Sequence, residues 1–73
     1  MNEGEGVALN SAEFNKSMEI IVEALKERGY DPYAQICGYL KENNPMYITQ
    51  HRNARGLIKQ LDVKEIQRFI SRL

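Results

Sequence analysis

The residues of this chain with side chains suited to catalysis or metal binding are few. His51 is the only histidine and Cys37 the only cysteine among 73 residues. A catalytic histidine needs a nucleophile or an orienting carboxylate, and a metal site needs several ligands. Neither residue has such neighbours in the sequence, and Cys37 has no basic neighbour that would activate its thiol. The sequence therefore predicts no catalytic residue, no metal site and no cofactor, and we expect no enzymatic activity.

A second candidate site is the stretch RGYDPYAQICGYL, residues 28–40. It holds three of the four tyrosines, two of the five glycines and the cysteine. Such a patch suits either ligand binding or packing. The glycines do not form a phosphate loop, because neither GxGxxG nor GxxxxGK[ST] occurs in the chain. Gly38 falls inside an expected helix, where glycine costs about 1 kcal/mol relative to alanine. Close approach of a partner helix is the interpretation we favour.

A third candidate is the basic segment HRNARGLIK, residues 51–59. It places Arg52, Arg55 and Lys59 at i, i+3 and i+7, on one exposed basic face of an expected helix. A helix-turn-helix protein would lay such a face in the major groove of DNA. Three cations make few phosphate contacts, however, and ten acidic residues balance the ten basic ones. A small nucleic-acid-associated protein is therefore the alternative hypothesis. The favoured one is a basic face that meets the acidic first helix of a second copy.

The apolar spacing predicts that helices carry these residues. One stripe recurs at helical period over residues 11–28 and consists of Phe14, Met18, Ile21, Val22 and Leu25. Shorter patterns predict a second helix from Pro32 to about Lys41, a helical turn over residues 46–49, a third helix over 49–60 and a last one over 62–73. No segment alternates as a strand does. The predicted fold is all-α, a small single-domain bundle of four short helices, with one further helical turn possible within it.

Helix start and stop signals support these boundaries. Gly29 suits the left-handed position that ends a helix. Asp31 is an N-cap candidate, followed by Pro32, which is tolerated at the first helical position because its missing N–H has no partner there. Asp62 and Glu65 have the spacing of a capping box at the start of the last helix.

Length and charge bound the remaining possibilities. A chain this short buries a thin core, and association is a common remedy, so we expect a homodimer. Residues 1–31 hold seven acids and three bases, a net charge of −4, whereas residues 41–59 hold four bases and one acid, a net charge of +3. This asymmetry suits oriented association.

We expect residues 1–9 to be a flexible tail and 10–73 one helical domain. A single cysteine and no export signal or long apolar run predict a cytoplasmic protein without membrane insertion.

The sequence from residue 29 onward resembles a known family. GYDPYAQICGYL, followed by NPMYITQHRNARGLIKQL, is similar to the pattern GY[ND]P-x-x-QI-x-GYL and then [ND]P-x-YI-x-x-H-x-x-AR-x-LI of the IreB family of small regulatory phosphoproteins of Gram-positive bacteria. The positions that match cover about half of the chain: Gly29, Tyr30, Asp31, Pro32, Gln35, Ile36, Gly38, Tyr39, Leu40, Pro45, Tyr47, Ile48, His51, Ala54, Arg55, Leu57 and Ile58.

The resemblance implies a small helical homodimer without enzymatic activity. It also implies a substrate of membrane Ser/Thr protein kinases with PASTA domains, in signalling of cell-envelope stress and antibiotic tolerance. Residues that we expect to pack or to form the dimer are Tyr30, Pro32, Ile36, Gly38, Tyr39, Leu40 and Tyr47. The favoured hypothesis is therefore a regulatory or adaptor protein that works by contact.

The N-terminal tail departs from the family pattern. Family members carry phospho-acceptor threonines there, but residues 1–10 contain no Ser, Thr or Tyr, and Thr49 is the only threonine of the chain. The acceptor role therefore cannot be transferred by matching positions, and the resemblance implies a divergent member of the family or a paralogue. Ser11 is the nearest hydroxyl and a weak acceptor candidate. Either Ser11 or Asn10 could also be the N-cap of the first helix. A phosphate on Ser11 would be favoured by the helix dipole.

Overall fold

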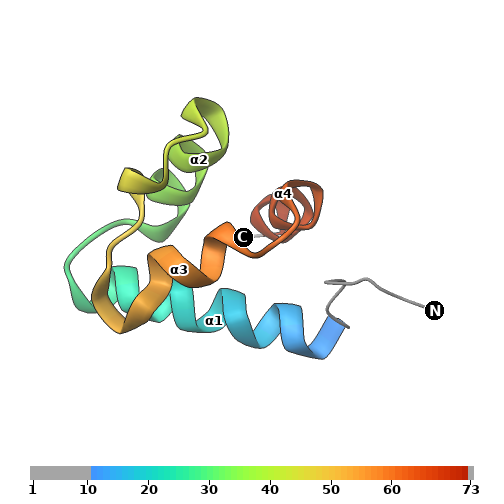
Figure 1. Ribbon diagram of the computed structural model, residues 1–73, viewed down its shortest axis with the longest axis horizontal. Coiled ribbons are helices and arrows are strands. Elements are labelled where there is room, and N and C mark those ends of the chain that lie inside the picture. The colour runs from blue at the N-terminus through green and yellow to red at the C-terminus, as the bar shows by residue number, and fades with distance from the viewer. Residues whose placement is uncertain (1–10, 73) are drawn as a thin grey trace.

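A computed structural model of the protein describes residues 11–72 (Figure 1). Its elements, in chain order, are α1 (Ser11–Glu27), α2 (Pro32–Glu42), the 3-10 turns η1 (Pro45–Tyr47) and η2 (His51–Asn53), α3 (Ala54–Lys59) and α4 (Val63–Ser71). These described residues contain no strand, so the all-α prediction is confirmed. The expected tail over residues 1–9 and the candidate N-cap Asn10 lie outside the described residues.

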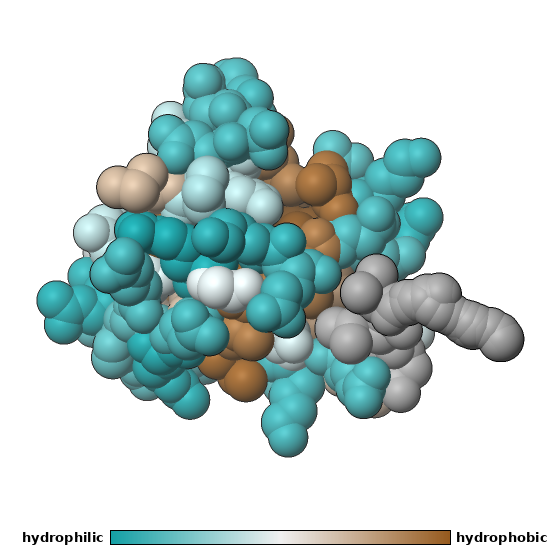
Figure 2. Space-filling view, viewed as in Figure 1, coloured by the Kyte–Doolittle hydropathy of each residue, from teal (hydrophilic) through white to brown (hydrophobic). Residues whose placement is uncertain are grey.

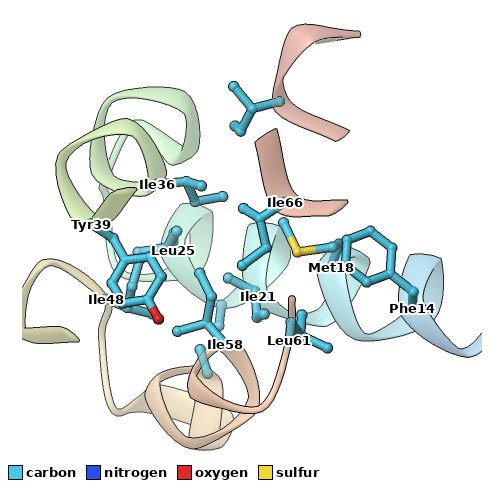
Figure 3. Close-up of a cluster of buried hydrophobic side chains, with 13 residues drawn as sticks. Phe14, Met18, Ile21, Leu25, Ile36, Tyr39, Ile48, Ile58, Leu61 and Ile66 are labelled. Atoms are coloured by element: carbon cyan, nitrogen blue, oxygen red, sulfur yellow. The ribbon is translucent and has the colours of Figure 1, made fainter. Parts of the chain in front are cut away.

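The core lies where the four helices meet (Figure 3). α3 packs along α1, and α2 packs against both α1 and α4. Side chains from the four α-helices, from the loop after η1 and from the turn after α3 converge on one buried cluster: Phe14, Met18, Ile21, Ala24, Leu25, Ile36, Tyr39, Ile48, Ala54, Ile58, Leu61, Ile66 and Ile70. The rings of Phe14 and Phe69 meet edge to face with centroids 6.2 Å apart. This contact joins the first turn of α1 to α4.

The predicted N-caps at Asp31 and Asp62 and the helix stop at Gly29 are present in the structure. The N–H of Tyr33 donates to the Asp31 carboxylate over 3.0 Å at the start of α2. The N–H of Glu65 donates to the Asp62 carboxylate over 3.1 Å at the start of α4. Gly29 follows α1 with φ +83°, a conformation that a side chain would strain. Short polar residues and one glycine thus set these three boundaries.

The structure differs from the sequence prediction mainly over residues 49–60, where one continuous helix is expected. η2 covers its first part, and the backbone turns left-handed at Arg52 (φ 55°) and Asn53 (φ 59°), so the regular helix begins only at Ala54. Ile48 and Ala54, which lie on either side of the break, are both fully buried in the core. The left-handed conformation costs roughly 1 to 2 kcal/mol at Arg52 and less at Asn53, because asparagine tolerates it.

Most of the surface seen in Figure 2 is hydrophilic. Hydrophobic residues show on this face in two places, between α2 and α4 and, lower in the view, by α1 and α3. Half-buried side chains that pack on the core from these helices are Cys37, Leu40 and Phe69. No helix within residues 11–72 is long and apolar enough to cross a membrane.

Candidate functional site

A concave surface lies where the end of α1, the start of α2 and residues 44–55 meet. We call residues 44–55 the corner segment. A cavity of about 410 Å³ opens there, which we call the corner pocket. It is lined by Arg28, Tyr30, Gln35, Met46, Tyr47, Thr49, Gln50, His51 and Arg55. Six of these nine residues belong to the corner segment, so the conformation of that segment determines the shape of the pocket.

Helix α2 holds the first part of the corner segment. The side-chain amide of Gln35 donates to the backbone carbonyl of Tyr47 over 2.9 Å. A Cβ atom built on Gly38 would lie 2.6 Å from two ring carbons of Tyr47, which is too close for any real contact. Gly38 is therefore required because an aromatic ring of the same chain packs on α2, whereas we expected the close approach of a partner helix. The Asn44 carboxamide caps η1 by accepting from the N–H of Met46 over 3.0 Å.

An arginine holds the second part of the corner segment. The Nε of Arg55 donates to the backbone carbonyl of Ile48 over 2.9 Å. The side chain of Ile48 is fully buried in the core, so Ile48 is held both by this hydrogen bond to its backbone and by the packing of its side chain. The hydroxyl of Thr49 accepts from the N–H of His51 over 3.1 Å and begins the next turn.

The last residues of the corner segment are tied to α1 by charge. Nε2 of His51 lies 2.7 Å from one carboxylate oxygen of Glu27, and Nη1 of Arg52 lies 3.4 Å from the other. The side chains of His51 and Glu27 are 36% and 47% exposed, so water screens the pair. Glu27 is an orienting carboxylate for His51 that the sequence spacing of 24 residues concealed. No group of three or more His, Cys, Asp or Glu in the described part of the chain has the geometry to hold a metal ion.

The three predicted basic residues do not form one face of one helix. Arg52 lies in η2 with a left-handed backbone and pairs with Glu27. Arg55 is half-buried and bonded to Ile48, while Lys59 is exposed at the end of α3. The break before Ala54 causes this separation because it removes the helical spacing between Arg52 and the other two. This arrangement does not favour the nucleic-acid alternative.

The residues predicted to pack or to form a dimer occupy three kinds of position. Ile36 and Tyr39 are buried in the core, and Pro32, Gly38 and Leu40 are half-buried on α2. Tyr30 and Tyr47 border the corner pocket and are exposed. The sequence interpretation overlooked Met46 and Tyr33, which are also large, apolar and exposed. Their exposure could not be read from helical spacing, since neither continues a stripe.

The candidate phospho-acceptor Ser11 is the first residue of α1 and is exposed. Thr49 is half-buried, and its hydroxyl caps η2, as described above. Cys37 is a free, half-buried thiol that packs on the core. Of these three nucleophilic side chains, Ser11 is the most accessible to an enzyme.

Comparison with known proteins places the chain in one family. The family model described as "IreB regulatory phosphoprotein" matches residues 6–72, which is nearly the whole chain. The chain belongs to the IreB family. Three relatives with the name UPF0297 protein come from Clostridia.

Three UPF0297 proteins illustrate the relationship. The one from Lachnoclostridium phytofermentans is 49% identical over 49 residues, covering 67% of this chain and 56% of the relative. The one from Clostridioides difficile is 39% identical over 62 residues, covering 85% and 73% respectively. The one from Ruminiclostridium cellulolyticum is 36% identical over 69 residues, covering 90% and 78%. The aligned part of the chain thus spans between about half and three quarters of these relatives. The family resemblance seen in the sequence motifs is confirmed.

Proposed function

We propose that this chain is a non-enzymatic regulatory protein of the bacterial cytoplasm that acts by binding other proteins. The observation that carries the proposal is the match of residues 6–72 to a family of regulatory phosphoproteins. The polar contacts of the corner pocket support the same proposal, because they order a loop segment rather than align a nucleophile with a base and an oxyanion site. We infer further that the chain is a substrate of a membrane Ser/Thr protein kinase in cell-envelope stress and antibiotic-tolerance signalling.

Phosphorylation of Ser11 is the form of this proposal that the structure makes testable. Ser11 is exposed at the N-terminus of a 17-residue helix, where the partial positive charge of the helix favours a phosphate. A phosphate at that position would add negative charge to a region of the sequence that is already acidic. It would therefore strengthen attraction to a basic partner surface.

The experiment is incubation of the full-length chain with a PASTA-domain Ser/Thr kinase, read by intact mass. We expect the addition of one phosphate group, which Ser11→Ala abolishes. Ser71→Ala removes another exposed serine, one that bonds to the carbonyl of Arg68, and serves as the matched control. A UPF0297 relative phosphorylated in the same reaction, with no added mass on this chain, would refute the kinase role.

We also propose that the chain is a homodimer. Support comes from its small core, from the hydrophobic residues that show between α2 and α4 in Figure 2, and from the opposite charges of residues 1–31 and 41–59. Leu40 is a half-buried apolar side chain of α2 that packs on the core. Leu40→Glu should convert a dimer to a monomer in light scattering after size exclusion, whereas Ala34→Glu, at an exposed position of the same helix, should not. A monomeric mass for the unmodified chain at high concentration would refute the dimer.

A further inference from the structure

The corner pocket combines features that the proposed regulatory role does not use. Its volume of about 410 Å³ lies within the range of sites for small molecules, roughly 300 to 1,000 Å³. It is framed by backbone that hydrogen bonds and a buried side chain hold in place, at Tyr47 and Ile48. A preformed cavity loses less conformational entropy when a ligand binds.

The charge of the pocket favours an anion. Arg28, His51 and Arg55 contribute to its lining, and none of its described lining residues is an aspartate or glutamate. The guanidinium of Arg28 makes no hydrogen bond or ion pair within the described part of the chain. Arg55 uses its Nε for the carbonyl of Ile48, which orients the guanidinium and leaves its terminal nitrogens for a ligand. The carboxylate of Glu27 contacts the lining residue His51 and is also paired with Arg52.

The rim of the pocket favours a flat or apolar ligand group. Tyr30 is 49% exposed, Tyr47 is 37% exposed and Met46 is 68% exposed, although all three carry large apolar side chains. The ring of Tyr47 is held against Gly38, so its orientation is fixed. Stacking of a base on an aromatic side chain contributes to affinity without demanding a particular base.

We propose that the corner pocket binds a phosphorylated small molecule with a flat ring, of the mononucleotide class. The guanidinium groups of Arg28 and Arg55 bind the phosphate, since their donors match phosphate oxygens in pairs. The rings of Tyr30 and Tyr47 contact the flat group of the ligand. Such a site would let a regulatory protein respond to a metabolite. It rests on the pocket alone, so it stands or falls independently of phosphorylation by a kinase.

The test is a titration of the isotope-labelled, full-length chain, followed by two-dimensional NMR. The probes are adenosine monophosphate, inorganic phosphate and adenosine at low ionic strength. We expect saturable shifts for the side-chain amides of Gln35 and Gln50, which line the pocket, with adenosine monophosphate binding at least about tenfold more tightly than either fragment. The side-chain amide of Gln67, exposed on α4, should not shift and serves as an internal control.

Variants assign the binding to the pocket. Arg28→Gln should weaken adenosine monophosphate binding by about tenfold or more, because a charge-assisted hydrogen bond is lost. Arg28→Lys should weaken it less, since the charge remains but the paired donors do not. Lys16→Gln removes one exposed positive charge from α1, outside the pocket, and should leave the affinity within a factor of about two.

Three results would overturn the proposal. The first is the absence of saturable binding at millimolar adenosine monophosphate. The second is equal affinity for inorganic phosphate and adenosine monophosphate, which would mean that the aromatic rim contributes nothing. The third is an equal loss of affinity in Arg28→Gln and Lys16→Gln, which would indicate diffuse attraction of anions rather than a site.

Discussion

Helix α1 and the corner segment bury residues equally well by different means. In α1, Met18, Ile21 and Leu25 are fully buried because helical spacing brings them to one face. In the corner segment, Ile48 is also fully buried, yet its neighbours follow no period. Its position depends on Gln35, Arg55 and the ring of Tyr47. The comparison shows that one part of the fold is encoded locally and the other by contacts between distant residues.

Replacing a buried isoleucine with alanine in each of the two regions should cause the largest losses of stability. Ile21→Ala should lower the free energy of unfolding by about 3 kcal/mol, because α1 and α3 cannot close around the cavity. Ile48→Ala should cost about 2 kcal/mol, since a loop relaxes into a cavity more readily than packed helices do. Chemical denaturation measures both values. Val63→Ala, at a residue that is 45% exposed, is the control and should change stability by less than about 0.5 kcal/mol. Equal losses of stability for Ile21→Ala and Ile48→Ala would contradict the expectation that the loop around Ile48 relaxes more readily than the packed helices α1 and α3.

Gly38→Ala should have the next largest effect, a loss of about 2 kcal/mol. The added methyl group would overlap the ring of Tyr47, and this cost exceeds the gain of about 1 kcal/mol in helix propensity. In a Tyr47→Ala background the same substitution should become neutral or stabilising, which a double-mutant cycle in urea detects. A cost that is the same in both backgrounds would place the clash elsewhere.

Arg55→Gln should lower the free energy of unfolding by about 1.5 kcal/mol. The carbonyl of Ile48 would lose a charged donor beside a buried side chain. Lys59→Gln, at an exposed position of the same helix, is the matched control and should be close to neutral in thermal unfolding. A neutral Arg55→Gln would mean that apolar burial alone fixes the corner segment.

The smallest expected effect belongs to the locally encoded part of the fold. Asp62→Ala removes the side-chain acceptor of the Glu65 N–H and should cost about 1 kcal/mol. Asp62→Asn retains an acceptor oxygen and should recover most of that loss, as measured by thermal unfolding. If both variants lost the same amount, the carboxylate charge rather than the cap geometry would be responsible.

The locally encoded features were predictable from the sequence. The stripe of α1, the stop at Gly29 and the caps at Asp31 and Asp62 each depend on residues within one or two turns. The capping box at Asp62 is present only in half, because the side chain of Glu65 pairs with Arg68 instead. An alternative partner three residues away has the same spacing as the box, so the sequence could not decide between them.

The candidate site was only partly predictable for the opposite reason. Arg52 and Arg55 suggested one helical face, but the left-handed backbone at Arg52 and Asn53 divides it. The pairing of His51 with Glu27 joins residues that are 24 positions apart. The motifs around Tyr30 and Tyr47 indicated that these residues matter, and the fold was needed to place both at one pocket.

Native-state hydrogen exchange tests most directly whether contacts between distant residues, and not helical spacing, hold the corner segment in place. The informative amides are those of Ile48, Asn53 and Arg55, which donate to Pro45, Gln50 and Thr49, compared with amides in the middle of α1. We predict that the corner amides are protected but open at lower free energy than those of α1, and that Arg55→Gln lowers protection in the corner segment far more than in α1. Equal protection of both regions, or an equal loss of protection in both on Arg55→Gln, would contradict the claim that the corner segment opens independently of α1.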